Sequence, residues 1–188
     1  MKFRASFTTL NLWKQGRYQD AVACYFHLPT YKSPEMVDGS DWHKRWSQHI
    51  NDTHTMPIEF GSAKLTNPIT EVKKVVSVAD WLDLAFIADL VDGSTIYEFK
   101  TGSTPSQSYL TSNQIGVYAV GLTLDKHFIN RGEIHHYNQY SKKADCSYLW
   151  ITDELLKDSL NWIETLASEM HQYLLTNNLY ERFANAGG

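Results

Sequence analysis

Cysteine is scarce in this chain of 188 residues, which contains only Cys24 and Cys146 and no Cys-x-x-Cys pair. So few cysteines argue against a disulfide framework, a four-cysteine cluster or a cysteine-rich zinc site. We therefore expect both cysteines to be small buried apolar residues in a reducing compartment.

Long apolar runs and an excess of basic residues are also missing. No segment has the length and apolar character of a membrane span or a signal peptide, so we expect a cytoplasmic protein without a membrane partner. The formal net charge is −4, which argues against a protein that coats nucleic acid by bulk charge. A nuclease remains allowed, because bound metal ions can offset local negative charge. The Gly-x-x-x-x-Gly-Lys-Ser/Thr sequence of a nucleotide-driven motor is absent.

Hydrophobic residues make up 43% of the chain and aromatic residues 13%, which indicates a folded globular protein. At this length, residues 1–188 are most simply one domain. The patterns predict helices, then strands, a helix, a hairpin and a last helix. This order favours an α/β domain with a small mixed β-sheet flanked by helices.

The stretch from Trp81 to Tyr118 holds the most informative residues. An apolar run from Leu82 to Val91 carries Asp89 near its end, and Asp92-Gly93 then predicts a tight hairpin turn. In the strand that follows, Glu98 and Lys100 point to one face because side chains alternate. Pairing of the two runs would bring Asp89 close to both.

Two carboxylates and an ammonium on a buried sheet are costly unless something holds them there. Carboxylate oxygens are the ligands that Mg²⁺ and Mn²⁺ prefer, so this pattern favours a hard divalent cation. A helix predicted from about Gln107 to Leu122 would place Gln114 and Tyr118 on one face, one turn apart.

The ordered set Asp89, Glu98-x-Lys100 and Gln114-x-x-x-Tyr118 resembles the core of the PD-(D/E)XK nuclease superfamily, in its RecB-type exonuclease branch. That branch also has an upstream Gly-x-x-x-His, and this chain has Gly39-Ser-Asp-Trp-His43. The resemblance runs from about residue 6 to about residue 118. It implies a restriction-endonuclease-like core.

The same resemblance implies roles for individual residues. Asp89 and Glu98 would hold a Mg²⁺ or Mn²⁺ ion, together with His43 and the backbone carbonyl of Phe99. Lys100 would orient the attacking water and stabilise negative charge. The remaining two candidates, Gln114 and Tyr118, would position a phosphate or the nucleophile.

The substrate implied is DNA, with an exonuclease favoured over an endonuclease. Some CRISPR-associated and phage RecB-like relatives carry an iron–sulfur cluster, for which Cys24 would be one ligand. The three further cysteines are missing, so no cluster is expected. The chain would act alone or within a repair, recombination, phage or CRISPR-related complex.

Several other polar residues have weaker patterns. Glu59 and Glu71 are candidates for the edge of the site, although a solvated carboxylate is the simpler interpretation of each. His135 and His136 are adjacent in a predicted strand, so they point to opposite faces and cannot chelate one ion together. We interpret them as ordinary sheet positions.

Two other classes of function stay open. One is a DNA-binding or assembly protein that keeps this fold without cleaving. The other is a metal-dependent phosphoesterase that acts on smaller substrates. The complete set of acids, lysine and histidine argues against the first, and metal-dependent release of nucleotides from DNA would separate all three.

Overall fold

The computed structural model describes residues 2–29 and 34–183 of the chain. The elements, in chain order, are β1 (Phe3–Ser6), α1 (Phe7–Lys14), α2 (Tyr18–Tyr25), α3 (Pro34–Thr53), the 3₁₀ turn η1 (Ile58–Phe60), β2 (Pro68–Ala79), β3 (Leu82–Asp92), β4 (Thr95–Thr101), the 3₁₀ turn η2 (Ser106–Tyr109), α4 (Gln114–Leu124), β5 (Arg131–Asn138), β6 (Lys143–Trp150), α5 (Asp153–Thr176) and α6 (Leu179–Phe183). This is the predicted α/β architecture. None of the described helices is long and apolar enough to cross a membrane.

A six-stranded mixed sheet forms the centre, in the order β1-β3-β4-β5-β6, with β2 paired to β3. The pairs β1–β3 and β4–β5 are parallel, and the other three are antiparallel. The predicted turn at Asp92-Gly93 joins β3 to β4, and Gly93 has a φ of 58°, which a glycine adopts without strain.

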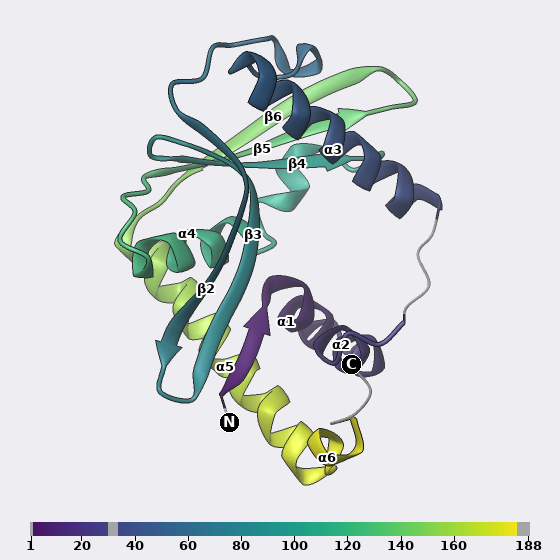
Figure 1. Ribbon diagram of the computed structural model, residues 1–188, viewed down its shortest axis with the longest axis vertical. Coiled ribbons are helices and arrows are strands. Elements are labelled where there is room, and N and C mark those ends of the chain that lie inside the picture. Colours follow the sequence, from purple (N-terminus) through teal and green to yellow (C-terminus); the bar gives the residue numbers. More distant parts are fainter. Residues whose placement is uncertain (1, 30–33, 184–188) are drawn as a thin grey trace.

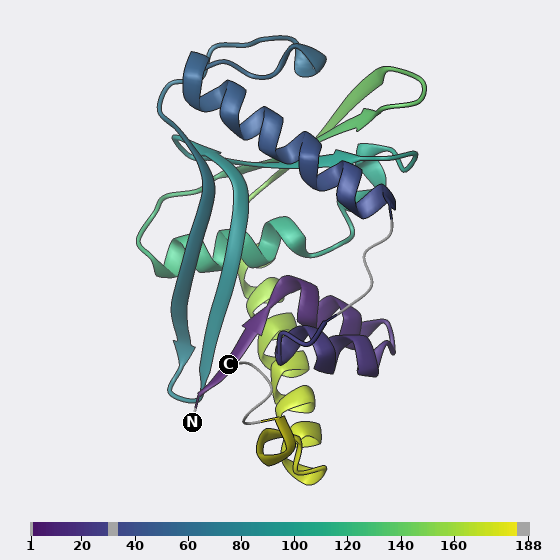
Figure 2. The ribbon, with the colours of Figure 1, turned by 45° about the vertical axis from the view of Figure 1, so that its right-hand side comes forward.

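Strand β3 forks the sheet. One of its edges pairs with β2 along nearly its whole length. On its other edge, Leu82–Ala85 pair with β1 and Leu90–Asp92 pair with β4, so residues 86–89 have no partner there among the described strands. Figures 1 and 2 show the consequence: the β2–β3 hairpin and the β4–β6 layer diverge. Asp89 lies where they separate.

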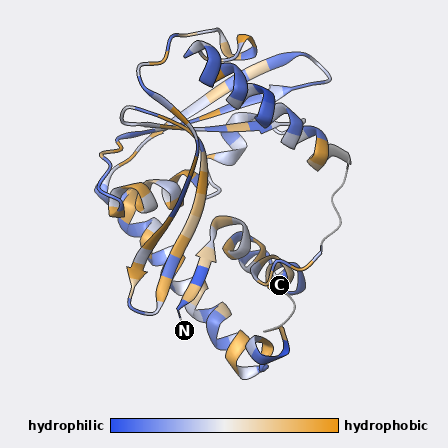
Figure 3. Ribbon diagram, in the orientation of Figure 1, coloured by the Kyte–Doolittle hydropathy of each residue, from blue (hydrophilic) through white to orange (hydrophobic). Residues whose placement is uncertain are grey.

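Helices α3 and α4 cover opposite faces of the β4–β6 layer (Figures 1 and 2). Under α3 lies a small core around Trp46, Ile50, Leu90 and Phe99. Helix α4 is mostly hydrophobic (Figure 3), and its residues from Ile115 to Leu122 are all buried in the main core. Burial on every side explains why this helix lacks a clear polar face.

Most predicted elements are confirmed, and some boundaries were wrong. Ser6 caps α1 by accepting a hydrogen bond from the backbone N–H of Thr9 (3.2 Å), but the strand β1 before it was not predicted. Helix α3 begins at Pro34, five residues before the Gly39 of the Gly-x-x-x-His pattern.

The predicted helix from Gln107 was also wrong, because η2 and a turn precede α4, which begins only at Gln114. The β5–β6 hairpin and a last helix capped by Thr152 are as predicted.

Candidate active site

The Asp89 carboxylate joins the two branches of the forked sheet. Its Oδ2 accepts a hydrogen bond from the backbone N–H of Phe99 on β4, at 2.8 Å. A side-chain oxygen thus replaces a ladder bond that the diverging strands no longer make, which fixes the carboxylate in place. Its other oxygen, Oδ1, lies 3.4 Å from Nδ1 of His43 on α3.

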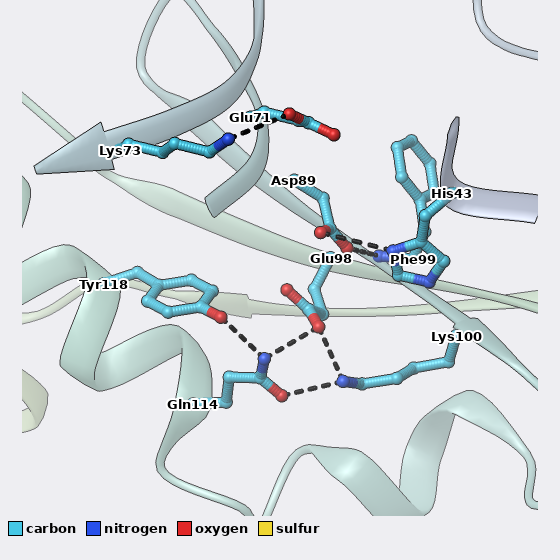
Figure 4. Close-up of polar contacts among 9 residues, drawn as sticks. All are labelled: His43, Glu71, Lys73, Asp89, Glu98, Phe99, Lys100, Gln114 and Tyr118. Carbon is cyan, nitrogen blue, oxygen red and sulfur yellow. Dashed lines mark hydrogen bonds and ion pairs between the residues drawn. The ribbon is translucent and has the colours of Figure 1, made fainter. Parts of the chain in front are cut away.

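Gly39 explains how α3 comes close enough for this contact. A Cβ at position 39 would lie 3.0 Å from Oγ1 of Thr101, the residue after Lys100. The absence of a side chain lets the helix pack directly on the end of β4. His43, one turn later on the same helix, then faces Asp89 (Figure 4).

Glu98 is the most buried charged side chain of the site, at 3% relative exposure. Its Oε1 accepts hydrogen bonds from Lys100 Nζ at 2.6 Å and from Gln114 Nε2 at 2.7 Å. Its Oε2 is buried and has no hydrogen-bond partner among the described residues. A buried carboxylate oxygen without a partner is costly, so it marks the place where a ligand would be stabilised.

Gln114 and Tyr118, one turn apart on α4, complete the network (Figure 4). The Gln114 side-chain oxygen accepts from Lys100 at 2.8 Å, and its amide nitrogen donates to the Tyr118 hydroxyl at 2.7 Å. Gln114 therefore fixes the ammonium and the carboxylate relative to each other.

The pKa values of the site indicate a surplus of negative charge. Burial, followed by the charge of Asp89, raises the pKa of Glu98 from 4.5 to about 7, although Lys100 opposes the shift. Burial favours neutral His43, but the hydrogen bond and charge of Asp89 outweigh it and raise the pKa of His43. Two groups thus hold protons more tightly than usual, which is the behaviour of a site suited to a cation.

The Lys100 ammonium stays charged in this setting. Burial opposes its charge, but attraction to Glu98 outweighs the burial and raises the pKa of Lys100. For Tyr118, burial and then the charge of Glu98 raise the pKa, so its hydroxyl remains a hydrogen-bond donor.

The donor set fits a hard divalent cation. Carboxylate oxygens from Asp89 and Glu98, with the imidazole of His43 beside them, suit Mn²⁺, and the carboxylates suit Mg²⁺. The structure therefore brings together, around one point, the side chains predicted from the sequence: His43, Asp89, Glu98, Lys100, Gln114 and Tyr118.

Glu71 lies on β2 at the position opposite Asp89, between the pairs Thr70–Leu90 and Val72–Ala88. Its φ of 50° is unusual for a non-glycine residue in a strand. Its carboxylate is exposed and lies 3.3 Å from Lys73 Nζ (Figure 4). An exposed carboxylate paired with a surface lysine agrees with the simpler interpretation of Glu71 as a solvated residue, and a role at the edge of the site stays a prediction. The other acid, Glu59, belongs to η1, away from these contacts.

The loop after β4 is held to the β5–β6 hairpin by hydrogen bonds. Buried His136 contacts the Gly102 carbonyl (2.9 Å) and the Asp145 carboxylate (2.6 Å). Ser106 is also buried, and its backbone N–H donates to Asp145 at 2.7 Å. The contacts of this loop with the hairpin join residues 34 and 39 positions apart in the sequence, so no local pattern signals them.

A groove of about 530 Å³ leads away from Tyr118 between the start of α1 and the β2–β3 hairpin. Lys73, Lys74 and Phe86 line it on the hairpin side, and Ser6 and Thr8 line it on the other. Its two lysines make it a candidate path for a polyanionic chain.

Comparison with solved structures gives clear matches. LHK-Exo of Laribacter hongkongensis, an alkaline exonuclease solved with dAMP, aligns with 97% of this chain and 94% of its own at a TM-score of 0.58 and 11% identity. The chain shares the fold of this exonuclease.

A phage-related exonuclease from Haemophilus somnus aligns with 87% of this chain and 82% of its own (TM-score 0.53, 9% identity). The protein SSO0001 aligns with 92% and 77% (TM-score 0.59, 14% identity). Neither the family models nor the curated sequences compared with the chain give a match. The likeness is therefore one of fold.

Proposed function

We propose that this protein is a metal-dependent deoxyribonuclease, and that it acts as an exonuclease. The observation that carries the proposal is the buried, unpartnered Oε2 of Glu98, set beside Asp89 and His43 and linked to Lys100. The fold shared with LHK-Exo and with the phage-related exonuclease supports the same reaction class.

His43, Asp89, Glu98 and the Phe99 carbonyl would hold a Mg²⁺ or Mn²⁺ ion. Such an ion, when bound, lowers the pKa of a water molecule and neutralises charge that develops on a phosphate. Lys100 places a fixed positive charge beside the carboxylates, where it would orient the attacking water and stabilise the phosphorane-like transition state.

Gln114 holds the side chains of Lys100 and Glu98 in a fixed position relative to each other. Tyr118 lines the start of the groove. One DNA strand in that groove would pass Lys73 and Lys74 before it reaches Tyr118. The phosphodiester to be cleaved would then lie over the acids.

The test is metal-dependent release of nucleotides from end-labelled linear DNA, measured beside a covalently closed circle of the same sequence. An exonuclease degrades the linear DNA with Mg²⁺ or Mn²⁺, spares the circle and stops with a chelator. Glu98→Gln, which keeps the size of the side chain and removes its charge, should abolish the release.

Three other results would each contradict the proposal and indicate a different function. Cleavage of the circle would indicate an endonuclease. DNA binding without cleavage at any metal concentration would indicate an assembly protein, and hydrolysis of small phosphodiesters alone would indicate a phosphoesterase.

A further inference from the structure

The β5–β6 hairpin carries a second cluster of metal-ligating groups. Glu98 is in register with Ile134, so the next residue, His135, points to the opposite face of the sheet, toward α3. Glu133 lies on that same face, two residues earlier. Cys146 is directly opposite His135 in the antiparallel pair.

The three ligand atoms are close together. His135 Nε2 lies 2.8 Å from Glu133 Oε2, and Cys146 Sγ lies 3.5 Å from His135 Nε2 and 3.9 Å from Glu133 Oε2. Around a tetrahedral zinc ion with ordinary bond lengths, such atoms are about 3.3–3.6 Å apart. Shifts of about half an ångström would therefore suffice to place an ion between them.

Neighbouring side chains hold two of the ligands in place. Arg131 Nε lies 2.9 Å from Glu133 Oε1, which leaves Oε2 directed at His135. The ring of His135 packs edge-on against Phe60, with ring centroids 5.2 Å apart, and is 8% exposed. Contacts of this kind orient metal ligands in known sites.

The cluster is also accessible, because Cys146 is exposed. Cys24 is partly exposed as well, so the expectation that both cysteines are buried was wrong. His135 occupies a buried position of β5, as expected of a sheet residue. An ion could enter from solvent, and a water molecule could take a fourth position.

We propose that Glu133, His135 and Cys146 form a second metal site, distinct from the candidate active site, which binds zinc or a similar thiolate-preferring divalent ion. A thiolate, an imidazole and a carboxylate are an established kind of zinc ligand set, whereas Mg²⁺ prefers oxygen ligands only. The bound ion would fasten the edge strand β6 to β5. The next residue on β5, His136, contacts the carbonyl of Gly102, which follows Lys100 by two residues.

Without an ion, the same three groups form a hydrogen-bonded cluster. Burial and then the charge of Glu133 raise the pKa of the Cys146 thiol to about 11, so the sulfur keeps its proton at neutral pH. Metal binding must therefore release that proton, because the ligand is the thiolate.

The main experiment is a titration of the metal-free full-length protein with Co²⁺, read by the thiolate-to-metal charge-transfer band. The candidate active site contains no sulfur, so it cannot produce this band even when it binds Co²⁺. We expect one band-forming ion per chain, displaced by one equivalent of Zn²⁺. Cys146→Ser should abolish the band, and Cys24→Ser, the matched control, should leave it unchanged.

Glu133→Gln and His135→Asn test the other two ligands, with circular dichroism to show that each variant is folded. Each should weaken Zn²⁺ binding at least about tenfold. The proposal is overturned if no band forms, if the band survives Cys146→Ser, or if a folded Glu133→Gln protein binds Zn²⁺ as tightly as the wild type. Because none of these readouts involves DNA, a failure here leaves the nuclease proposal standing, and the reverse also holds.

Discussion

Lys100 contacts the Glu98 carboxylate, as any charge partner would, and also the Gln114 side-chain oxygen, which a simple charge partner would not need. This geometry fixes the direction of its ammonium group. If Lys100 orients water and stabilises charge, Lys100→Ala and Lys100→Met should each lower kcat at least about 100-fold, or about 2.7 kcal/mol.

Cleavage at saturating Mn²⁺ is the measurement for Lys100, with metal and DNA binding measured in parallel. Both bindings should persist, because Asp89, Glu98 and His43 are unchanged. Turnover close to wild type in both variants would remove Lys100 from the mechanism, and with it much of the case for a nuclease.

His43 is 32% exposed at its side chain, so its loss should create little cavity in the core. His43→Ala should weaken Mn²⁺ binding at least about tenfold and leave the melting temperature near that of the wild type. His49→Ala is the control, because His49 lies on the same helix and contacts Thr55 instead. A large loss of stability with normal metal binding would instead make His43 a packing residue.

Glu98 links the site to stability. Its folded-state pKa of about 7 exceeds its ordinary value of 4.5. The folded protein therefore holds this proton more tightly than the unfolded chain. The resulting stabilisation is complete below pH 4.5 and is lost as the pH rises through about 7.

The metal-free protein should accordingly lose stability over this pH window, and Glu98→Gln should lose less. The measurement is the melting temperature against pH in the presence of a chelator. A wild-type melting temperature that rises with pH, with the variant rising in parallel, would contradict the assignment. Added Mn²⁺ should reverse the loss in the wild type only.

At the scale of elements, the approach of α3 to β4 determines whether the site is complete. Gly39→Ala would place a methyl group 3.0 Å from Thr101 Oγ1, so the Thr101 side chain or the helix must shift by a few tenths of an ångström. We expect several-fold weaker Mn²⁺ binding through the displaced His43, with a stability loss of about 1 kcal/mol or less.

A second substitution tests this explanation. Thr101→Ala removes the crowding oxygen, so the double variant Gly39→Ala/Thr101→Ala should recover Mn²⁺ affinity compared with Gly39→Ala alone. Unchanged affinity in Gly39→Ala, or a loss that Thr101→Ala does not relieve, would show that the close approach of α3 does not set the position of His43.

For the whole molecule, the formal charge of −4 means that DNA must be held by local rather than bulk charge. Lys73 and Lys74 line the groove that begins at Tyr118. Lys73→Gln/Lys74→Gln should weaken DNA binding and lower the slope of log affinity against log salt by about 1–2. Metal affinity should not change.

The control for the groove is Lys64→Gln/Lys157→Gln, which changes the net charge equally at exposed positions elsewhere. Equal effects of the two double variants would indicate that DNA is held by overall charge. A normal salt slope in Lys73→Gln/Lys74→Gln would place the DNA path outside this groove.

The sequence by itself determined the strand pair that carries the candidate active site. Alternation placed Glu98 and Lys100 on one face, and the Asp92-Gly93 turn set the register that brings Asp89 beside them. These are local consequences of strand geometry and turn type, which a short stretch of sequence carries completely. Helical spacing likewise placed Gln114 and Tyr118 on one face of a helix, one turn apart.

Only the tertiary structure decided the contacts between distant segments. The fork in β3, the unpartnered Glu98 oxygen and the meeting of His135 with Cys146 depend on which strands pair and where they diverge. The burial of Ser106 depends on Asp145, 39 residues later. Such contacts are set by packing of the whole chain, because the conformational propensity of a short polar segment does not indicate which distant residues it will contact.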